Sequence, residues 1–109
     1  MNFKVKSISV FEKQAKRLIK KYPSLKYELL ELISVLKKSP TQGVSIGHNC
    51  YKIRIAIASK GKGKSGGARI ITNLVVSEDT VYLISIYDKS ERESLSDKEL
   101  VELLKFIPR

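Results

Sequence analysis

The amino-acid sequence predicts an α+β domain, with an antiparallel β-sheet packed by an N-terminal helical hairpin and a C-terminal helix in the order β-α-α-β-β-β-α. Apolar side chains recur at helical spacing over residues 9–38, where Pro23 divides them into two segments. Residues 51–87 contain three apolar segments joined by short connections, and these favour antiparallel pairing because parallel crossovers need about a dozen residues. At 109 residues, the chain is expected to form a single domain over residues 1–109.

The N-terminal part is expected to contain one strand and two helices. Phe3–Ser7 alternates apolar and polar side chains, as a short strand does. Ser9 and Glu12 have the spacing of a capping box for the first helix, which ends at Pro23, and Ser39-Pro40 ends the second helix. The apolar stripes that we expect to pack on the sheet consist of Phe11, Ala15, Leu18, Ile19 and Tyr22 in the first helix and of Leu25, Leu29, Leu32, Ile33 and Leu36 in the second.

Three strands are predicted in the C-terminal half, at Tyr51–Ala58, Ala68–Val76 and Thr80–Tyr87. The connections between them are turns at Lys60–Gly67 and around Ser77–Asp79.

A loop and a helix flank these strands. The loop is predicted over residues 41–49, and its His48 is a secondary candidate for a functional site. The helix is predicted from Asp97 to about Phe106, because Ser96 and Glu99 form a second capping-box pattern before an apolar stripe.

One face of the predicted sheet carries a cluster of cations. Alternation in the strand 51–58 places Lys52 and Arg54 on the side opposite its isoleucines. The return strand brings Arg69 beside Arg54, and a three-residue loop at 77–79 then sets Tyr87 opposite Arg69. A two-residue turn would set Tyr87 opposite Ile70 instead.

The charge distribution points to an acidic partner. The chain has 21 Lys and Arg residues against 11 Asp and Glu, a net charge of +10. From Leu32 to Ser77 there are eight cations and no carboxylate. Such asymmetry is typical of proteins that bind nucleic acid. The alternative is a basic surface that only keeps the protein soluble.

The glycine-rich loop does not match a nucleotide-binding motif in context. Gly61, Gly63 and Gly66 have the spacing G-x-G-x-x-G, but a strand follows where a dinucleotide site needs a helix. A Walker A loop would need glycine at position 58, which is Ala58. What remains is a loop with three lysines that can contact a phosphate backbone through charge.

The composition gives no indication of disulfides, metal or export. Cys50 is the only cysteine and His48 the only histidine, so that neither an intramolecular disulfide nor a four-ligand zinc site is expected within the chain. No apolar leader or membrane span is found in the sequence, and we expect a cytoplasmic protein without a cofactor.

From Tyr51 through the Lys60–Gly67 loop to Ile71, and again over Leu83–Lys89, the sequence resembles the RelE/ParE superfamily of bacterial toxins. The glycine- and lysine-rich loop is most similar to the HigB-like branch of RelE toxins. The resemblance covers nearly the whole chain. It implies a RelE-like fold, a ribosome-dependent endoribonuclease that cuts mRNA in the ribosomal A site, and a cognate antitoxin encoded beside it. Operator DNA would be contacted only indirectly, through that antitoxin, and no membrane is involved.

The resemblance also implies which residues act. Lys52 and Arg54 match the paired cations of the second RelE strand, and Arg69 matches the arginine that opens the third. Lys89 lies where RelE has a catalytic arginine, and Tyr87 is the nearest substitute for a RelE tyrosine whose place is taken by Leu95. The predicted catalytic residues are Lys52, Arg54, Arg69, Tyr87 and Lys89. The predicted contacts to RNA and the ribosome are Lys60, Lys62, Lys64 and Arg92.

The chemistry implied needs a base, positive charge on the phosphate and an acid. Lys52 is the candidate base, because the charges of Arg54 and Arg69 favour its neutral form. The arginines would hold the phosphate, and Tyr87 would stack on a nucleobase. We further expect Arg69 on an exposed strand face, so that Arg69→Ala abolishes toxicity and leaves the fold intact.

Two other functions stay open. ParE-type members of the superfamily share the fold but inhibit gyrase without cutting RNA, and in such a toxin the sheet cations would be dispensable. A plain RNA- or DNA-binding module would also be basic, but it would need aromatic side chains interleaved with the cations on the open face.

Overall fold

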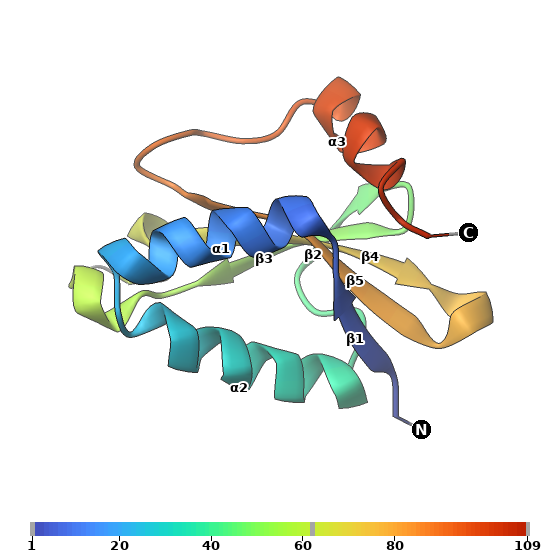
Figure 1. The fold of residues 1–109 in the computed structure, drawn as a ribbon, viewed down its shortest axis with the longest axis horizontal. Helices are drawn as coiled ribbons and strands as arrows, with labels where there is room; N and C mark the ends of the chain where they lie inside the picture. The colour runs from blue at the N-terminus through green and yellow to red at the C-terminus, as the bar shows by residue number, and fades with distance from the viewer. Residues whose placement is uncertain (1, 62, 109) are drawn as a thin grey trace.

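The computed structural model shows three helices and a five-stranded mixed sheet, and it describes residues 2–61 and 63–108, without the side chain of Lys64 (Figure 1). Among these residues, the strands are β1 (Lys4–Ser7), β2 (Val44–Gly47), β3 (Cys50–Ile55), β4 (Ala68–Val75) and β5 (Thr80–Asp88). The α-helices are α1 (Ser9–Lys21), α2 (Leu25–Lys38) and α3 (Asp97–Leu104). Short 3-10 turns lie at η1 (Ala58–Lys60), η2 (Lys64–Gly66) and η3 (Val76–Glu78).

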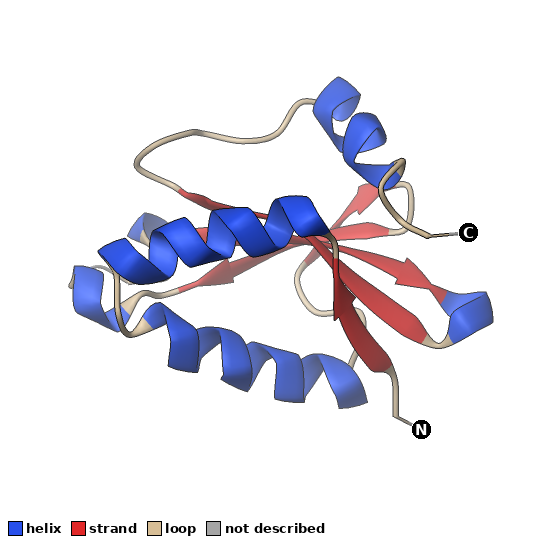
Figure 2. Ribbon diagram, in the orientation of Figure 1, coloured by secondary structure: helices blue, strands red, loops and turns tan. Residues whose placement is uncertain are grey.

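The sheet has the strand order β1-β5-β4-β3-β2 (Figure 2). The pairs β3–β4 and β4–β5 are antiparallel, as predicted. Strand β2, which was not predicted, pairs antiparallel with β3, and β1 pairs parallel with β5. The α+β class is therefore confirmed, and the sheet is mixed rather than wholly antiparallel. The parallel pair is possible because the helical hairpin and three further strands separate β1 from β5 in the chain.

The helical hairpin covers the sheet with the apolar stripes that the sequence predicts. Phe11, Ala15 and Leu18 of α1 are buried, and so are four leucines of α2. The capping box predicted at Ser9 is wrong. Helix α1 begins at Ser9 itself, so that the N-cap residue is Ile8, whose side chain makes no capping hydrogen bond. The Glu12 carboxylate instead accepts a hydrogen bond from the hydroxyl of Ser7, the last residue of β1, at 2.6 Å.

Strand β2 lies in the segment predicted to be a loop. It is short and mostly exposed, and its alternation of Val44 and Ile46 with Ser45 and Gly47 covers only four residues, the lower limit for a strand signal. Its turn into β3 contains His48 and Asn49, both with positive φ (55° and 58°), which is typical of a tight hairpin turn. At its other end β3 stops at Ile55, three residues earlier than predicted, because the chain turns into η1.

The predicted register across the cation cluster is confirmed. Arg54 pairs with Arg69, and Arg69 with Tyr87. The connection between β4 and β5 is one residue longer than predicted, since Val75 pairs with Thr80. A bulge in β5 between the pairs of Ile71 and Thr72 restores the register before Tyr87 is reached.

Helix α3 lies on the side of the sheet away from α2 (Figure 1). Its capping box is confirmed: the Glu99 amide donates to Ser96 Oγ and the Ser96 amide donates to Glu99 Oε1, both at 3.1 Å. Residues 89–96, here called the connecting segment, join β5 to α3 and appear in orange in Figure 1. None of the helices described is long and apolar enough to span a membrane.

Candidate active site

The register brings three of the predicted catalytic residues together. Arg54, Arg69 and Tyr87 are direct cross-strand neighbours on β3, β4 and β5 and therefore share one face of the sheet. Lys52 lies two residues before Arg54, on the same face, opposite Ile71. The face bearing Lys52, Arg54, Arg69 and Tyr87 is called the cation face below.

These side chains differ widely in their exposure. Arg54 is exposed and Lys52 is half-buried. Arg69, by contrast, is only 5% exposed, which corrects the expectation of an exposed strand-face residue. Its guanidinium donates from Nη1 to the carbonyl oxygen of Ala68 and from Nη2 to that of Ser65, both at 3.2 Å. Arg69 therefore holds the end of the glycine-rich loop against β4 as well as contributing charge to the cation face.

Tyr87 is also almost fully buried, at 5% exposure. Its hydroxyl has no hydrogen-bond partner among the residues that the structure describes. Burial raises the pKa of Tyr87, although the positive charges of Arg69 and Arg92 oppose this shift. The Arg92 guanidinium lies 5.7 Å from the centre of the Tyr87 ring, at a distance typical of a cation–π contact.

The connecting segment brings both charge signs to the edge of the cation face. Lys89 Nζ lies 2.5 Å from a carboxylate oxygen of Glu93, and Arg92 donates to both carboxylate oxygens of Glu99 at 2.7 and 2.9 Å. Lys89 lowers the pKa of Glu93 through a hydrogen bond and its charge, and Lys52 and Arg69 lower it further. A single exposed carboxylate thus lies within the field of three predicted catalytic cations.

A small cavity lies between the cation face and the start of α3. It has a volume of about 160 Å³ and its lining includes Lys52, Tyr87, Leu95 and Asp97. Leu95, expected from the resemblance to take the place of a RelE tyrosine, thus lines this cavity with an apolar side chain.

The glycine-rich loop differs from the expectation of a loop with three exposed lysines. Lys60 has a side chain only 9% exposed, and its ammonium group lies 2.5 Å from the fully buried carboxylate of Asp88. Its expected exposure is therefore wrong, because η1 folds the side chain inward. Lys62 lies outside the described residues, and so does the side chain of Lys64.

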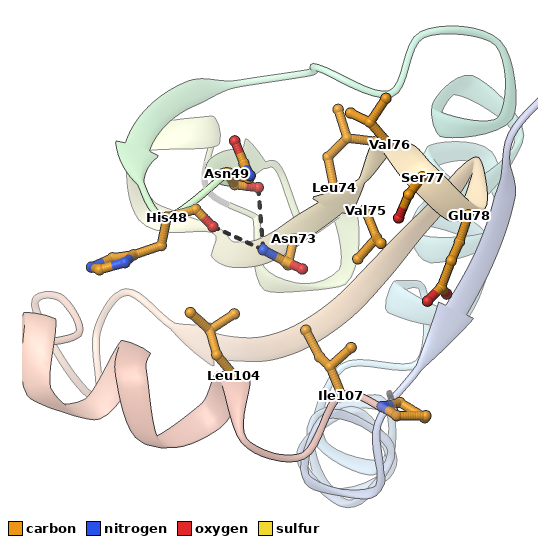
Figure 3. A pocket seen from close by; sticks show the side chains of 11 residues that line it. His48, Asn49, Asn73, Leu74, Val75, Val76, Ser77, Glu78, Leu104 and Ile107 are labelled. Atoms are coloured by element: carbon orange, nitrogen blue, oxygen red, sulfur yellow. Dashed lines mark hydrogen bonds between the residues drawn. The ribbon is translucent and has the colours of Figure 1, made fainter.

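A larger cavity lies elsewhere, where the turns at one end of the sheet meet the end of α3 (Figure 3). It measures about 640 Å³, and Asn73 in its wall donates to the carbonyl oxygen of His48 at 2.9 Å. His48 Nε2 lies 3.2 Å from Asp97 Oδ1. None of the catalytic residues predicted from the sequence lines this cavity, and His48 does not join the cation face.

Two carboxylates near the site were missing from the sequence-based prediction. Asp88 ends a strand in which Ile84 and Ile86 alternate toward the helices, and a carboxylate at the next position of that series is a signal of a buried partner. Glu93 carries no such signal, because its place beside Lys89 depends on the path of the connecting segment. Among the described residues, no group of three or more His, Cys, Asp or Glu side chains is placed to hold a metal ion.

The family is decided by a match over residues 3–107 to the model of the RelE toxin of the RelE/RelB toxin–antitoxin system. The chain belongs to the RelE toxin family. Solved structures agree in fold: a free double-arginine mutant of Escherichia coli RelE is 16% identical with a TM-score of 0.65, covering 99% of this chain and 100% of that one. The isolated E. coli RelE toxin is 17% identical with a TM-score of 0.52, covering 98% of this chain and 100% of that one.

A third RelE structure contains the same mutant with a peptide of the antitoxin RelB. It is 18% identical to this chain, with a TM-score of 0.52 and coverage of 99% and 100%. At these identities the structures establish the RelE fold. The position of the chain in the HigB-like branch stays a prediction.

Proposed function

We propose that this RelE-family chain is the toxin of a type II toxin–antitoxin system and acts as a ribosome-dependent endoribonuclease on mRNA. The observation that carries the proposal is the convergence of Lys52, Arg54, Arg69 and Tyr87 on one face, with Lys89 at its edge. A nuclease that uses the ribosome to position its substrate needs only a small cluster of charge, and this face provides one beside a cavity.

The proposed reaction is attack of a ribose 2′-oxygen on the adjacent phosphorus. Lys52 takes the proton from the 2′-hydroxyl, the 2′-oxygen–phosphorus bond forms and the bond from phosphorus to the 5′-oxygen breaks. The leaving 5′-oxygen receives a proton from Lys89 or from water, so that the products are a 2′,3′-cyclic phosphate and a 5′-hydroxyl. Arg54 and Arg69 stabilise the charge that develops on the phosphate oxygens.

A cognate antitoxin is part of this proposal. The RelE relative bound to a RelB peptide supports such a partner. We expect the antitoxin to bring carboxylates to the cation face, so that the rate of association falls as salt is raised. An association rate that does not depend on ionic strength would place the contact on another surface.

The test is cleavage of mRNA on translating ribosomes by the purified chain and by Arg54→Ala. Arg54 is the best residue to change because it is exposed, so that the substitution removes charge with little effect on the fold. The loss of one donor to the reacting phosphate should lower the cleavage rate about a hundredfold. Lys16→Ala removes another exposed charge, from α1, and should leave the rate unchanged.

The outcomes separate the possible functions. Cleavage sites mapped within translated codons, with naked RNA left intact, would support the proposal. Growth arrest with intact mRNA would favour a ParE-like inhibitor. Equal cleavage of naked and ribosome-bound RNA would refute the dependence on the ribosome.

A further inference from the structure

The side chain of Asp88 is the centre of a buried polar network behind the cation face. It is 0% exposed. Oδ2 accepts a hydrogen bond from the Tyr22 hydroxyl at 2.7 Å. Oδ1 accepts one from Lys60 Nζ at 2.5 Å and two from Ser90, through its amide at 2.9 Å and its hydroxyl at 2.7 Å. One carboxylate thus joins the end of α1, the base of the glycine-rich loop and the start of the connecting segment.

The position of Asp88 in the chain connects this network to the predicted catalytic residues. Asp88 is flanked by Tyr87 and Lys89, two predicted catalytic residues, and successive strand residues point to opposite faces. The Lys89 amide donates to the carbonyl oxygen of Gly67 at 3.0 Å, and Ser90, the next residue, is bound to Asp88. Lys89 is therefore fixed at its own amide and at the residue after it.

The same network also holds the glycine-rich loop in place. A Cβ atom at Gly67 would lie 2.0 Å from the carbonyl oxygen of Ile55, so that only glycine allows β3 and β4 to approach so closely here. Lys60 also donates to Ser90 Oγ at 3.1 Å. Both ends of the loop are thus bound to the residues around Asp88.

We propose that Asp88 is a positioning residue of the proposed endoribonuclease: with Lys60 and Tyr22, it holds Tyr87 and Lys89 in the geometry that the reaction needs. The proposal rests on the proposed function. It gives Lys60 a new role, as an internal anchor of the loop rather than a contact to RNA.

A contribution to the stability of the fold does not by itself explain why such a network is present. A buried ion pair has to repay the loss of hydration of both charges, and its replacement by apolar side chains of similar size is often neutral or stabilising. Burial opposes ionisation of Asp88, but the hydrogen bonds from Lys60, Tyr22 and Ser90 prevail and hold the pKa of the carboxyl well below its usual range. The network therefore keeps a fixed charge and a fixed geometry directly behind the cation face.

The decisive variant replaces the network with apolar groups in one step: Tyr22→Phe, Lys60→Met and Asp88→Leu. We expect a folded protein with a melting temperature close to that of the wild type. We expect kcat for mRNA on ribosomes to fall about ten- to a hundredfold, as for small misplacements of reacting groups, with KM nearly unchanged. The control Glu91→Gln removes the exposed ion pair between Glu91 of the connecting segment and Arg17 of α1 and should leave both parameters unchanged.

A measurement independent of activity accompanies the kinetics. Amide hydrogen exchange should become faster at Lys89 and Ser90 in the triple variant, while core amides such as that of Ile70 keep their protection. If the wild-type chain itself fails to cleave mRNA, the proposed function fails, and the exchange pattern still reports whether Asp88 anchors the segment.

Three results would overturn the proposal. The first is a folded triple variant with unchanged kcat. The second is an equal loss of protection across the core, which would show that the network holds the fold rather than the site. The third is an unchanged kcat in Tyr22→Phe alone. This milder variant keeps the ion pair of Lys60 with Asp88 and removes only the hydrogen bond of a half-buried side chain. An unchanged kcat there would contradict a positioning role even if the triple variant did not fold.

Discussion

Arg69→Ala is expected to destabilise the protein, in contrast to the expectation from sequence. Arg69 is 5% exposed, and its guanidinium donates to the carbonyl oxygens of Ala68 and Ser65. Hydrogen bonds from a charged donor contribute about 1.5 to 3 kcal/mol each, so that removal of the side chain should lower the free energy of unfolding by about 3 kcal/mol. For a domain of 109 residues, this corresponds to a fall of about 13 °C in the melting temperature.

The assay is thermal unfolding followed by circular dichroism, with Arg54→Ala as the matched control. Both variants lose one arginine from the same row of the sheet, but Arg54 is exposed, and its loss should shift stability by less than about 0.5 kcal/mol. Arg69→Lys should lie between Arg69→Ala and the wild type, because an ammonium group lacks the planar fork that reaches two carbonyl oxygens.

A melting temperature for Arg69→Ala within about 3 °C of the wild type would refute this reasoning, since it would mean that the buried guanidinium adds nothing to the fold. The expected result also changes how activity should be read. Loss of toxicity in Arg69→Ala would combine misfolding with loss of chemistry, whereas loss of toxicity in Arg54→Ala reports on chemistry alone.

Two further predictions concern carboxylates. Glu93→Gln removes a negative charge that lies beside Lys89 and near Lys52, so that binding of a short RNA at low salt should become roughly two- to fivefold tighter by fluorescence anisotropy; an unchanged Kd would contradict the placement of Glu93. The pKa of Asp88 is lower in the folded than in the unfolded chain, so that its stabilisation is present above about pH 4 and is lost as pH falls through the folded value. Urea unfolding at several pH values should therefore show a shallower loss of stability in acid for Asp88→Asn, and an equal slope would contradict the assignment.

The elements that sequence reasoning predicted well are those specified by local patterns. Leu18 of α1 and Leu36 of α2 are fully buried because the spacing of apolar residues on a helix determines which face it buries. The alignment of Arg54 with Arg69 and Tyr87 was also predictable, because side-chain alternation allows only registers that keep the apolar face inward. The bulge in β5 follows from this constraint. The longer turn between β4 and β5 would have placed the side chains of β5 on the wrong faces of the sheet, and the extra residue of the bulge restores them to the correct faces.

The features that were not predictable depend on partners distant in the chain. Lys60 and Asp88 are separated by 28 positions, and nothing in the glycine-rich loop indicates that one of its lysines turns inward. Arg69 differs, since the guanidinium donates to the carbonyl oxygen of Ser65, only four residues away, and the contact depends on the path of the glycine-rich loop. A pattern of lysines and glycines specifies charge and flexibility, but it does not specify the loop path or the tertiary contacts that decide exposure.

The same distinction limits what the net charge of +10 says about RNA binding. Of the cations near the site, Lys52 and Arg54 have no carboxylate within ion-pair distance among the described residues, whereas Lys89 and Arg92 are each paired with a glutamate. A cation that exchanges a glutamate for a phosphate releases no additional counterion. If all four acted as free charges, log Kd for single-stranded RNA would rise with log salt concentration with a slope of about 2.8, whereas two free charges give a slope of about 1.4. The structure favours the smaller slope, and in this protein the carboxylates of the connecting segment, rather than the number of lysines, determine how strongly salt weakens binding.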